Sequence, residues 1–244
     1  MHLHRLSTHL LCVLLMSHGT YTLGQVVSGE DSTCGPLRPP GQYGPYDFRK
    51  DRDKISVVVD NHFQPMVEHL ISGQTSMYVG GDIDFTLRAI PNHPNALMSM
   101  MLLGEKEKTT APRGSRYSVE CWFERAIRFR PDDNVVRMIY TNFLTKKKRK
   151  PEAMQQLDIV LTTAKDNALT YNNVGLLYFD LGEYQKALVQ AHKAIELGLN
   201  RPDLPRQLQS VGKWSDPVAE TSEIPSNIPS PKLEAPAASE TLKP

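Results

Sequence analysis

The stretch from Ala168 to Arg201, ALTYNNVGLLYFDLGEYQKALVQAHKAIELGLNR, decides the fold of this chain. Small and apolar residues recur in it at helical spacing on both sides of a turn at Leu181-Gly182. The pattern predicts two short amphipathic helices. Because two helices of this size cannot bury their apolar faces alone, it also predicts neighbouring pairs. The residues on these faces are Tyr171, Val174, Gly175 and Tyr178 before the turn and Ala187, Leu188, Ala191, Ala194 and Ile195 after it.

The same pattern recurs toward the N-terminus at a constant spacing of 34, which separates Ala194 from Val160 and Val160 from Ala126. A fourth unit fits with a spacing of 37, from Ala89 to Ala126, if the polar loop GEKEKTTAPRGSR holds three extra residues. Pro94 and Pro131 both lie five residues after the alanine of their unit, where we expect a helix to stop. The sequence therefore predicts four helix pairs in one register.

Helical periodicity begins near His62 and predicts helices over 62–71 and 82–89, a turn leading into a third helix within 91–106, and helices over 118–129, 135–144 and 151–164. The two helices of the opening stretch and a capping helix over 203–212 follow. We expect a turn at Gly80-Gly81, with Asp82 as the N-cap of the next helix. Residues 25–60 are rich in Gly, Pro and charge, which predicts an irregular N-terminal arm. Within this arm, the β-branched run ISVVVD at 55–60 is expected to be extended.

The 34-residue period and the residues at its repeat positions resemble the tetratricopeptide repeat (TPR). The resemblance is closest over 168–201 and covers roughly 63–214. It implies an all-α fold, with residues 61–214 forming a right-handed α-solenoid of about four helix pairs plus a C-terminal capping helix. The segments GGDIDFTLRAIPNHPNAL and VECWFERAIRFRPDDN are also similar to exported bacterial TPR proteins of unassigned function.

This resemblance implies a concave groove, lined by the first helix of each pair, that binds an extended peptide or a partner protein. Asn142 and Asn173 match the two asparagines of the TPRs that clamp a C-terminal carboxylate. Met138, Asp203 and Gln207 stand where that clamp has cations, so we do not expect a true clamp. The side-chain amides of Asn142, Asn172 and Asn173 would instead hydrogen-bond the backbone of an extended ligand. The alternative is that they only cap or solvate the groove. The groove residues implied by the register are Asn142, Thr145, Asn172, Asn173, Leu176 and Phe179.

The two ends of the chain differ in composition from the middle. Residues 1–24 have a weakly basic start, a short apolar run and small residues before Gly24, which predicts a signal peptide cleaved after Gly24 or Gly19. An uncleaved anchor or a buried helix is the alternative. Export predicts a periplasmic or secreted protein. Residues 215–244 are rich in Pro, Ser, Ala and Glu and predict a disordered tail.

Three cysteines are present, and removal of the leader with Cys12 leaves Cys34 and Cys121. An even pair in an oxidising compartment favours a disulfide that pins the arm to the helical domain. Two separate thiols, with Cys121 buried as a small apolar residue, are the alternative. CxxC spacing is absent, so neither a redox motif nor a zinc site is predicted.

Net charge gives little indication of partners, because 28 basic residues nearly balance 27 acidic ones. No nucleic-acid partner is therefore predicted. A basic run lies in one inter-helix turn and would contact an anionic envelope surface, or it is only a solvated turn. Its residues are Lys146, Lys147, Lys148, Arg149 and Lys150.

No catalytic motif, cofactor motif or metal-ligand spacing is present, so we expect neither an enzyme nor a cofactor. The function expected is a scaffold for protein–protein interaction in a cell-envelope assembly or secretion process. The alternative is a metal-binding or hydrolytic enzyme on the first repeat, where metal-competent side chains concentrate. They are His62, Glu68, His69, Asp82, Asp84 and His93.

Overall fold

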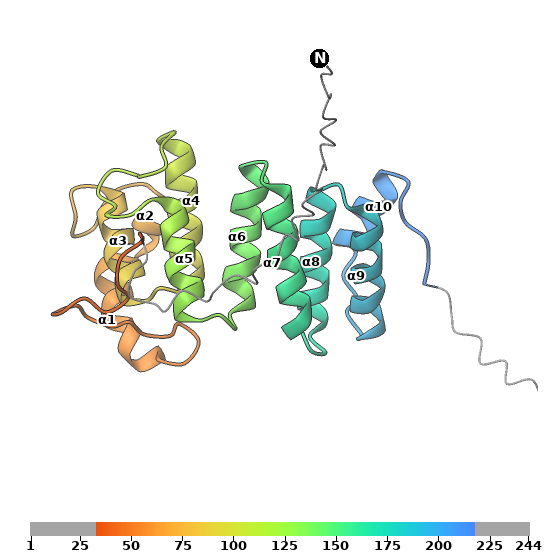
Figure 1. The fold of residues 1–244 in the computed structure, drawn as a ribbon, viewed down its shortest axis with the longest axis horizontal. Helices are drawn as coiled ribbons and strands as arrows, with labels where there is room; N and C mark the ends of the chain where they lie inside the picture. The colour runs from red at the N-terminus through yellow and green to blue at the C-terminus, as the bar shows by residue number, and fades with distance from the viewer. Residues whose placement is uncertain (1–32, 218–244) are drawn as a thin grey trace, which may run out of the picture. The chain divides into compact units, whose positions relative to one another are not determined.

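The computed structural model describes residues 33–217 and divides the chain into two compact units, Met1–Lys147 and Lys148–Pro244 (Figure 1). The predicted signal peptide and residues 218–244 of the predicted tail lie outside the described residues. Within 33–217 every regular element is a helix, which confirms the all-α class. The helices of this range are all too short or too polar to cross a lipid bilayer.

The first unit contains six helices within its described residues, and they pack in chain order: α3 against α4, α4 against α5, and α5 against α6. Their core includes Leu87, Leu97, Trp122 and Leu144, all fully buried. Helices α1 and α2 pack on α3 at the start of this array. The helices are α1 (Arg52–His62), α2 (Pro65–Glu68), α3 (Val79–Ala89), α4 (Pro94–Lys106), α5 (Val119–Phe129) and α6 (Asn134–Lys146).

The second unit has four helices in its described part, and α8 packs along α9 as a hairpin that turns at Gly182, where φ is +74°. Tyr178, Ala187 and Ala191 of this hairpin are buried as the periodicity predicts. The last helix packs on both members of the hairpin. The helices are α7 (Lys150–Thr163), α8 (Ala168–Asp180), α9 (Tyr184–Glu196) and α10 (Asp203–Ser210).

The irregular arm before α1 is fixed to the first unit by covalent and polar contacts. Cys34 forms the predicted disulfide with Cys121 of α5, with the two Cα atoms 5.1 Å apart. The buried guanidinium of Arg125 donates to the carbonyl oxygens of Cys34 and Pro36, each at 2.9 Å. At Gly44, φ is +86° and a Cβ atom would lie 2.3 Å from the carbonyl oxygen of Ala89, so only glycine fits there.

Residues 55–60 are helical, which corrects the prediction of an extended segment and ends the irregular arm at Asp51 rather than at residue 60. Ile55 and Val58 are one helical turn apart and pack against Ala89 and Ile90. The β-branched residues have no strand to pair with, so burial on this helix decides their conformation rather than strand propensity. The helix expected over 62–71 is also shorter, because α2 ends at Glu68 and Leu70 has a φ of 58°.

The prediction of a turn at Gly80-Gly81 is wrong, because both glycines lie inside α3. A Cβ at Gly80 would lie 2.4 Å from the carbonyl oxygen of Arg113, so close packing requires this glycine. Asp82 does not cap the helix; its buried carboxylate accepts the backbone N–H groups of Gln74, Thr75 and Ser76 in the preceding loop.

The spacing assigned to the first repeat also needs correction. From α3 to α5 the spacing is 40 rather than 37, both at the first residues (Val79 and Val119) and at the last (Ala89 and Phe129). Pro94 is the first residue of α4 and does not stop a helix. Aligning Ala89 with Ala126 gave the wrong spacing, because the two alanines are not at equivalent helical positions. Ala126 lies within α5, whereas Ala89 is the last residue of α3.

Candidate binding surface and pocket

Three helices, α4, α6 and α8, begin in the same way. In each, the side chain of the residue before the helix accepts a backbone N–H of the first turn, and these N-caps are His93, Asp133 and Asn167. Because the start of each helix is fixed, residues at equal distances from the cap occupy equivalent helical positions. We call the second, fifth, ninth and twelfth residues after each N-cap the stripe of that helix, since they fall on one helical face.

In the first unit the stripes of α4 and α6 present apolar side chains that the core does not cover. Met98, Leu102 and Val135 are 43%, 40% and 48% exposed. The predicted groove residues Asn142 and Thr145 belong to the same stripe of α6 and are half-buried, and the Thr145 hydroxyl donates to the carbonyl oxygen of Thr141. The two stripes consist of Asn95, Met98, Leu102 and Glu105 on α4 and Val135, Met138, Asn142 and Thr145 on α6.

In the second unit the stripe of α8 consists of Leu169, Asn172, Leu176 and Phe179. Leu169 is 47% exposed, while Leu176 and Phe179 are half-buried, as is the predicted Asn173 beside them. Asn172 is buried, and its amide donates to a carboxylate oxygen of Asp203 at 3.5 Å. Helix α10 therefore covers Asn172, which corrects its prediction as a ligand contact.

Sequence reasoning missed Met98, Leu102, Val135 and Leu169 as surface residues. On α4, Met98 is exposed, whereas Met100 and Met101 are buried. Counting residues from the polar N-cap of each helix would have identified all four. The N-caps fix the start of each helix, whereas the repeat-position alanines used for the alignment do not.

The basic run between α6 and α7 is largely neutralised by carboxylates. Lys146 pairs with Glu105 at 3.0 Å, and Lys150 pairs with Glu183 at 2.6 Å. Arg149 pairs with Glu152, and the Lys147 ammonium lies 5.5 Å from the centroid of the Phe143 ring. The attraction of this turn to an anionic surface is correspondingly smaller than its sequence suggests, and that partner remains a proposal.

The metal-competent side chains of the first repeat are engaged at separate places. His62 contacts Asp82 at 2.9 Å, whereas Asp84 accepts from Arg88 at 2.8 Å and Glu68 accepts from Asn95. In the described part of the chain, the one group with metal-ligand proximity is Cys34, Cys121 and Glu124. Its two sulfur atoms are bonded to each other, so they are not available as thiolate ligands.

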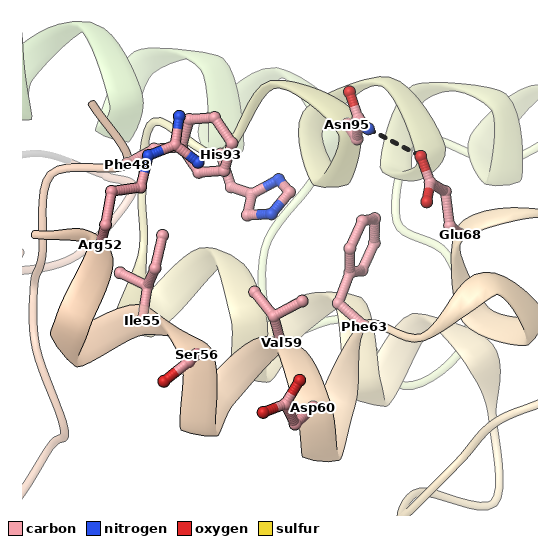
Figure 2. A pocket seen from close by; sticks show the side chains of 10 residues that line it. All are labelled: Phe48, Arg52, Ile55, Ser56, Val59, Asp60, Phe63, Glu68, His93 and Asn95. Carbon is pink, nitrogen blue, oxygen red and sulfur yellow. Dashed lines mark hydrogen bonds between the residues drawn. The ribbon is translucent and has the colours of Figure 1, made fainter. Parts of the chain in front are cut away.

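A pocket of about 390 Å³ opens between α1 and the start of α4 (Figure 2). Ile55, Val59 and Phe63 form its apolar wall, and the His93 ring points toward them from the opposite side. Polar groups surround the opening, with Arg52 at one end and the hydrogen-bonded pair of Glu68 and Asn95 at the other. The volume lies within the range of small-ligand pockets. Asn95 also belongs to the stripe of α4, so the pocket adjoins that surface.

His93 is held in this pocket in its neutral form. Its ring lies between Phe48 and Phe63, with centroids 4.4 and 4.9 Å away. Burial lowers the pKa of His93 to about 4, and the nearby positive charge of Arg52 acts in the same direction. Nδ1 accepts the N–H of Ala96, so the proton of the neutral ring is on Nε2.

Acidification from pH 6.5 to 4 is expected to lower the free energy of unfolding of the first unit by about 3 kcal/mol through His93. The folded pKa lies below the unfolded value near 6.5, so the unfolded state binds more protons. The stabilisation is complete above pH 6.5 and is lost as the pH falls toward 4. Urea unfolding at several pH values measures this loss. In His93→Asn, which keeps a capping acceptor, the slope should flatten; an unchanged slope would contradict the assignment.

No family model matches the chain, and no curated protein or solved structure matches it either.

Proposed function

We propose that this protein is an exported TPR-like interaction module whose exposed stripes bind an extended segment of a partner protein. The observation that carries the proposal is the apolar exposure along the stripes that follow three N-caps, above all at Val135 and Leu169 in the second position and at Leu102 in the ninth. Single exposed apolar residues are ordinary, but repeated ones on one face of several helices indicate an interaction surface.

The spacing of the helices supports the TPR-like part of the proposal. From α6 to α8 the spacing is 34 at both ends of the helix, and the same spacing of 34 separates the first residues of α7 and α9. Under this proposal the chain forms a right-handed α-solenoid of about four helix pairs, and α10 covers the last pair. The first repeat deviates because its loop is longer.

The export part of the proposal rests on the leader and on the bridge between Cys34 and Cys121. A disulfide between the arm and α5 suits an oxidising compartment such as the periplasm or the cell exterior. A cell-envelope assembly or a secretion process would supply protein partners in such a place.

A peptide selected on the full chain from a phage-displayed random library is expected to bind about 10-fold more weakly to Leu102→Glu and to Leu169→Glu. Each substitution places a charge on an apolar contact. The control is Val189→Glu on α9, which is 60% exposed and lies outside the stripes. It should change the affinity by less than about twofold, since it adds the same charge away from the ligand. Fluorescence anisotropy gives the dissociation constants.

Failure to select any peptide, or equal weakening by all three substitutions, would refute the proposal. The first outcome shows that the stripes bind no extended segment. The second shows that added charge acts at long range instead of at the contact.

A further inference from the structure

The pocket between α1 and α4 has the ring of His93 at its base. Nδ1 of this ring accepts the N–H of Ala96 at 3.2 Å, which leaves Nε2–H to face the pocket. The side chain is only 4% exposed and lines the pocket, with Nε2–H as its remaining polar group. The Nε2–H faces the pocket, so a ligand that brings an acceptor can take its hydrogen bond.

Arg52 supplies a positive charge at the same end of the pocket. Its guanidinium lies 4.3 Å from the centroid of the Phe48 ring, which itself packs against His93 in a tilted arrangement. The neighbouring cations Arg49 and Lys54 pair with Asp132 and Asp51, whereas no ion pair of the described residues involves Arg52. A planar guanidinium held on an aromatic face is well suited to bind a carboxylate.

The opposite end of the pocket is negatively charged. Asp60 and Glu68 line it, and Glu68 is oriented by a 2.7 Å hydrogen bond from Asn95. Between the two ends lie Ile55, Val59 and Phe63, which can cover an aliphatic group. The ligand that fits is therefore acidic at the Arg52 end, apolar in the middle and not acidic at the Glu68 end.

We propose that this pocket is an anchoring site for one carboxylate-bearing residue of the partner segment, with the carboxylate on Arg52 and His93 Nε2–H and a neighbouring aliphatic side chain on Ile55, Val59 and Phe63. This proposal rests on the proposed function and names the chemistry of the segment that binds. The carboxylate comes from an acidic side chain or from the C-terminus of the partner.

The test is a titration of the full-length chain with short peptides, followed through the NMR methyl signals of Ile55 and Val59. Acetyl-Leu-Glu-amide offers a side-chain carboxylate, acetyl-Leu-Leu with a free C-terminus offers a terminal one, and acetyl-Leu-Gln-amide offers neither. We expect at least one acidic peptide to bind about 10-fold more tightly than the Gln peptide. The tighter of the two acidic peptides identifies the source of the carboxylate.

Arg52→Gln is expected to remove this preference, and it should leave the fold intact because Arg52 is exposed. The matched control is Lys50→Gln, which removes an exposed cation two residues away and outside the pocket. It should keep the preference within about twofold, because the Lys50 ammonium is exposed to solvent and does not line the pocket. Binding of both acidic peptides no tighter than that of the Gln peptide, tighter binding of acetyl-Leu-Lys-amide, or a preference that survives Arg52→Gln would each overturn the proposal.

These outcomes are separate from those that test the proposed function. If selected peptides lose affinity for Leu102→Glu and Leu169→Glu while the acidic peptides show no preference, the anchoring site is wrong and the interaction surface stands. If no peptide is selected and the acidic peptides still bind, the pocket serves a small acidic ligand and the partner segment is wrong.

Discussion

Asp47→Ala is expected to lower the free energy of unfolding of the first unit by about 3–4 kcal/mol. The Asp47 side chain is fully buried and joins the arm to the turns that follow α3 and α5. One carboxylate oxygen accepts from Asn92 at 2.8 Å, and the other accepts from Arg130 at 2.6 Å and from Arg49 at 3.1 Å. Its removal leaves Asn92 without one hydrogen-bond partner, and it leaves Arg49 and Arg130 without the carboxylate that they share.

Urea unfolding followed by the fluorescence of the buried Trp122, in a Trp214→Phe background, measures this loss in the first unit. Asp132→Ala is the matched control, because Asp132 pairs with the same Arg49 at 3.0 Å but its side chain is 66% exposed. That variant should lose less than about 1 kcal/mol, as is usual for exposed pairs. Equal losses in the two variants would show that burial of Asp47 contributes nothing.

The pH dependence gives a second readout of the same group. Although burial alone would raise it, hydrogen bonds from Arg49, Asn92 and Arg130 hold the pKa of Asp47 well below its ordinary value. A depressed carboxylate pKa stabilises the fold fully above the unfolded value near 3.9, and the stabilisation is lost as the pH falls further. The free energy of unfolding should therefore fall more in the wild type than in Asp47→Ala as the pH drops below 4. This range lies below the pKa of His93, which is about 4.

The helices could be predicted because they depend on local residue spacing, and the disulfide could be predicted from the number of cysteines. Amphipathic spacing fixes α5 to α9, and the predicted loss of the leader with Cys12 leaves one possible pairing, that of Cys34 with Cys121. The burial of Ile55 and Val58 could not be predicted, since it depends on where α3 places Ala89 and Ile90. Local propensity favoured a strand there, and tertiary contact decided for a helix.

The candidate site was predictable only in part, for a related reason. Asn142, Leu176 and Phe179 follow from the helical register, and the structure places them on the stripes. Asn172 shares that register, but the packing of Leu204 of α10 close to Gly175 buries this part of α8. The pocket at His93 needs α1, α2 and α4 together, and no spacing within one helix reveals it.

Replacing Cys34 and Cys121 together by serine is expected to lower the free energy of unfolding by about 4–5 kcal/mol. The two cysteines are 87 residues apart, so the bridge closes a long loop and restricts the unfolded chain strongly. The arm should remain docked below the unfolding transition, because Arg125 still donates to the carbonyl oxygens of residues 34 and 36. Hydrogen exchange of residues 34–47 tests this docking directly.

The single variants Cys34→Ser and Cys121→Ser separate loss of the bridge from loss of packing. Either one opens the same loop, so each should lose about as much stability as the double variant, and the effects should not add. Additive losses would mean that the sulfur atoms act as two independent buried thiols. In that case the oxidised, leader-free protein would also show two free thiols on titration. With the bridge formed it should show none, and reduction alone should reproduce the stability of the double variant.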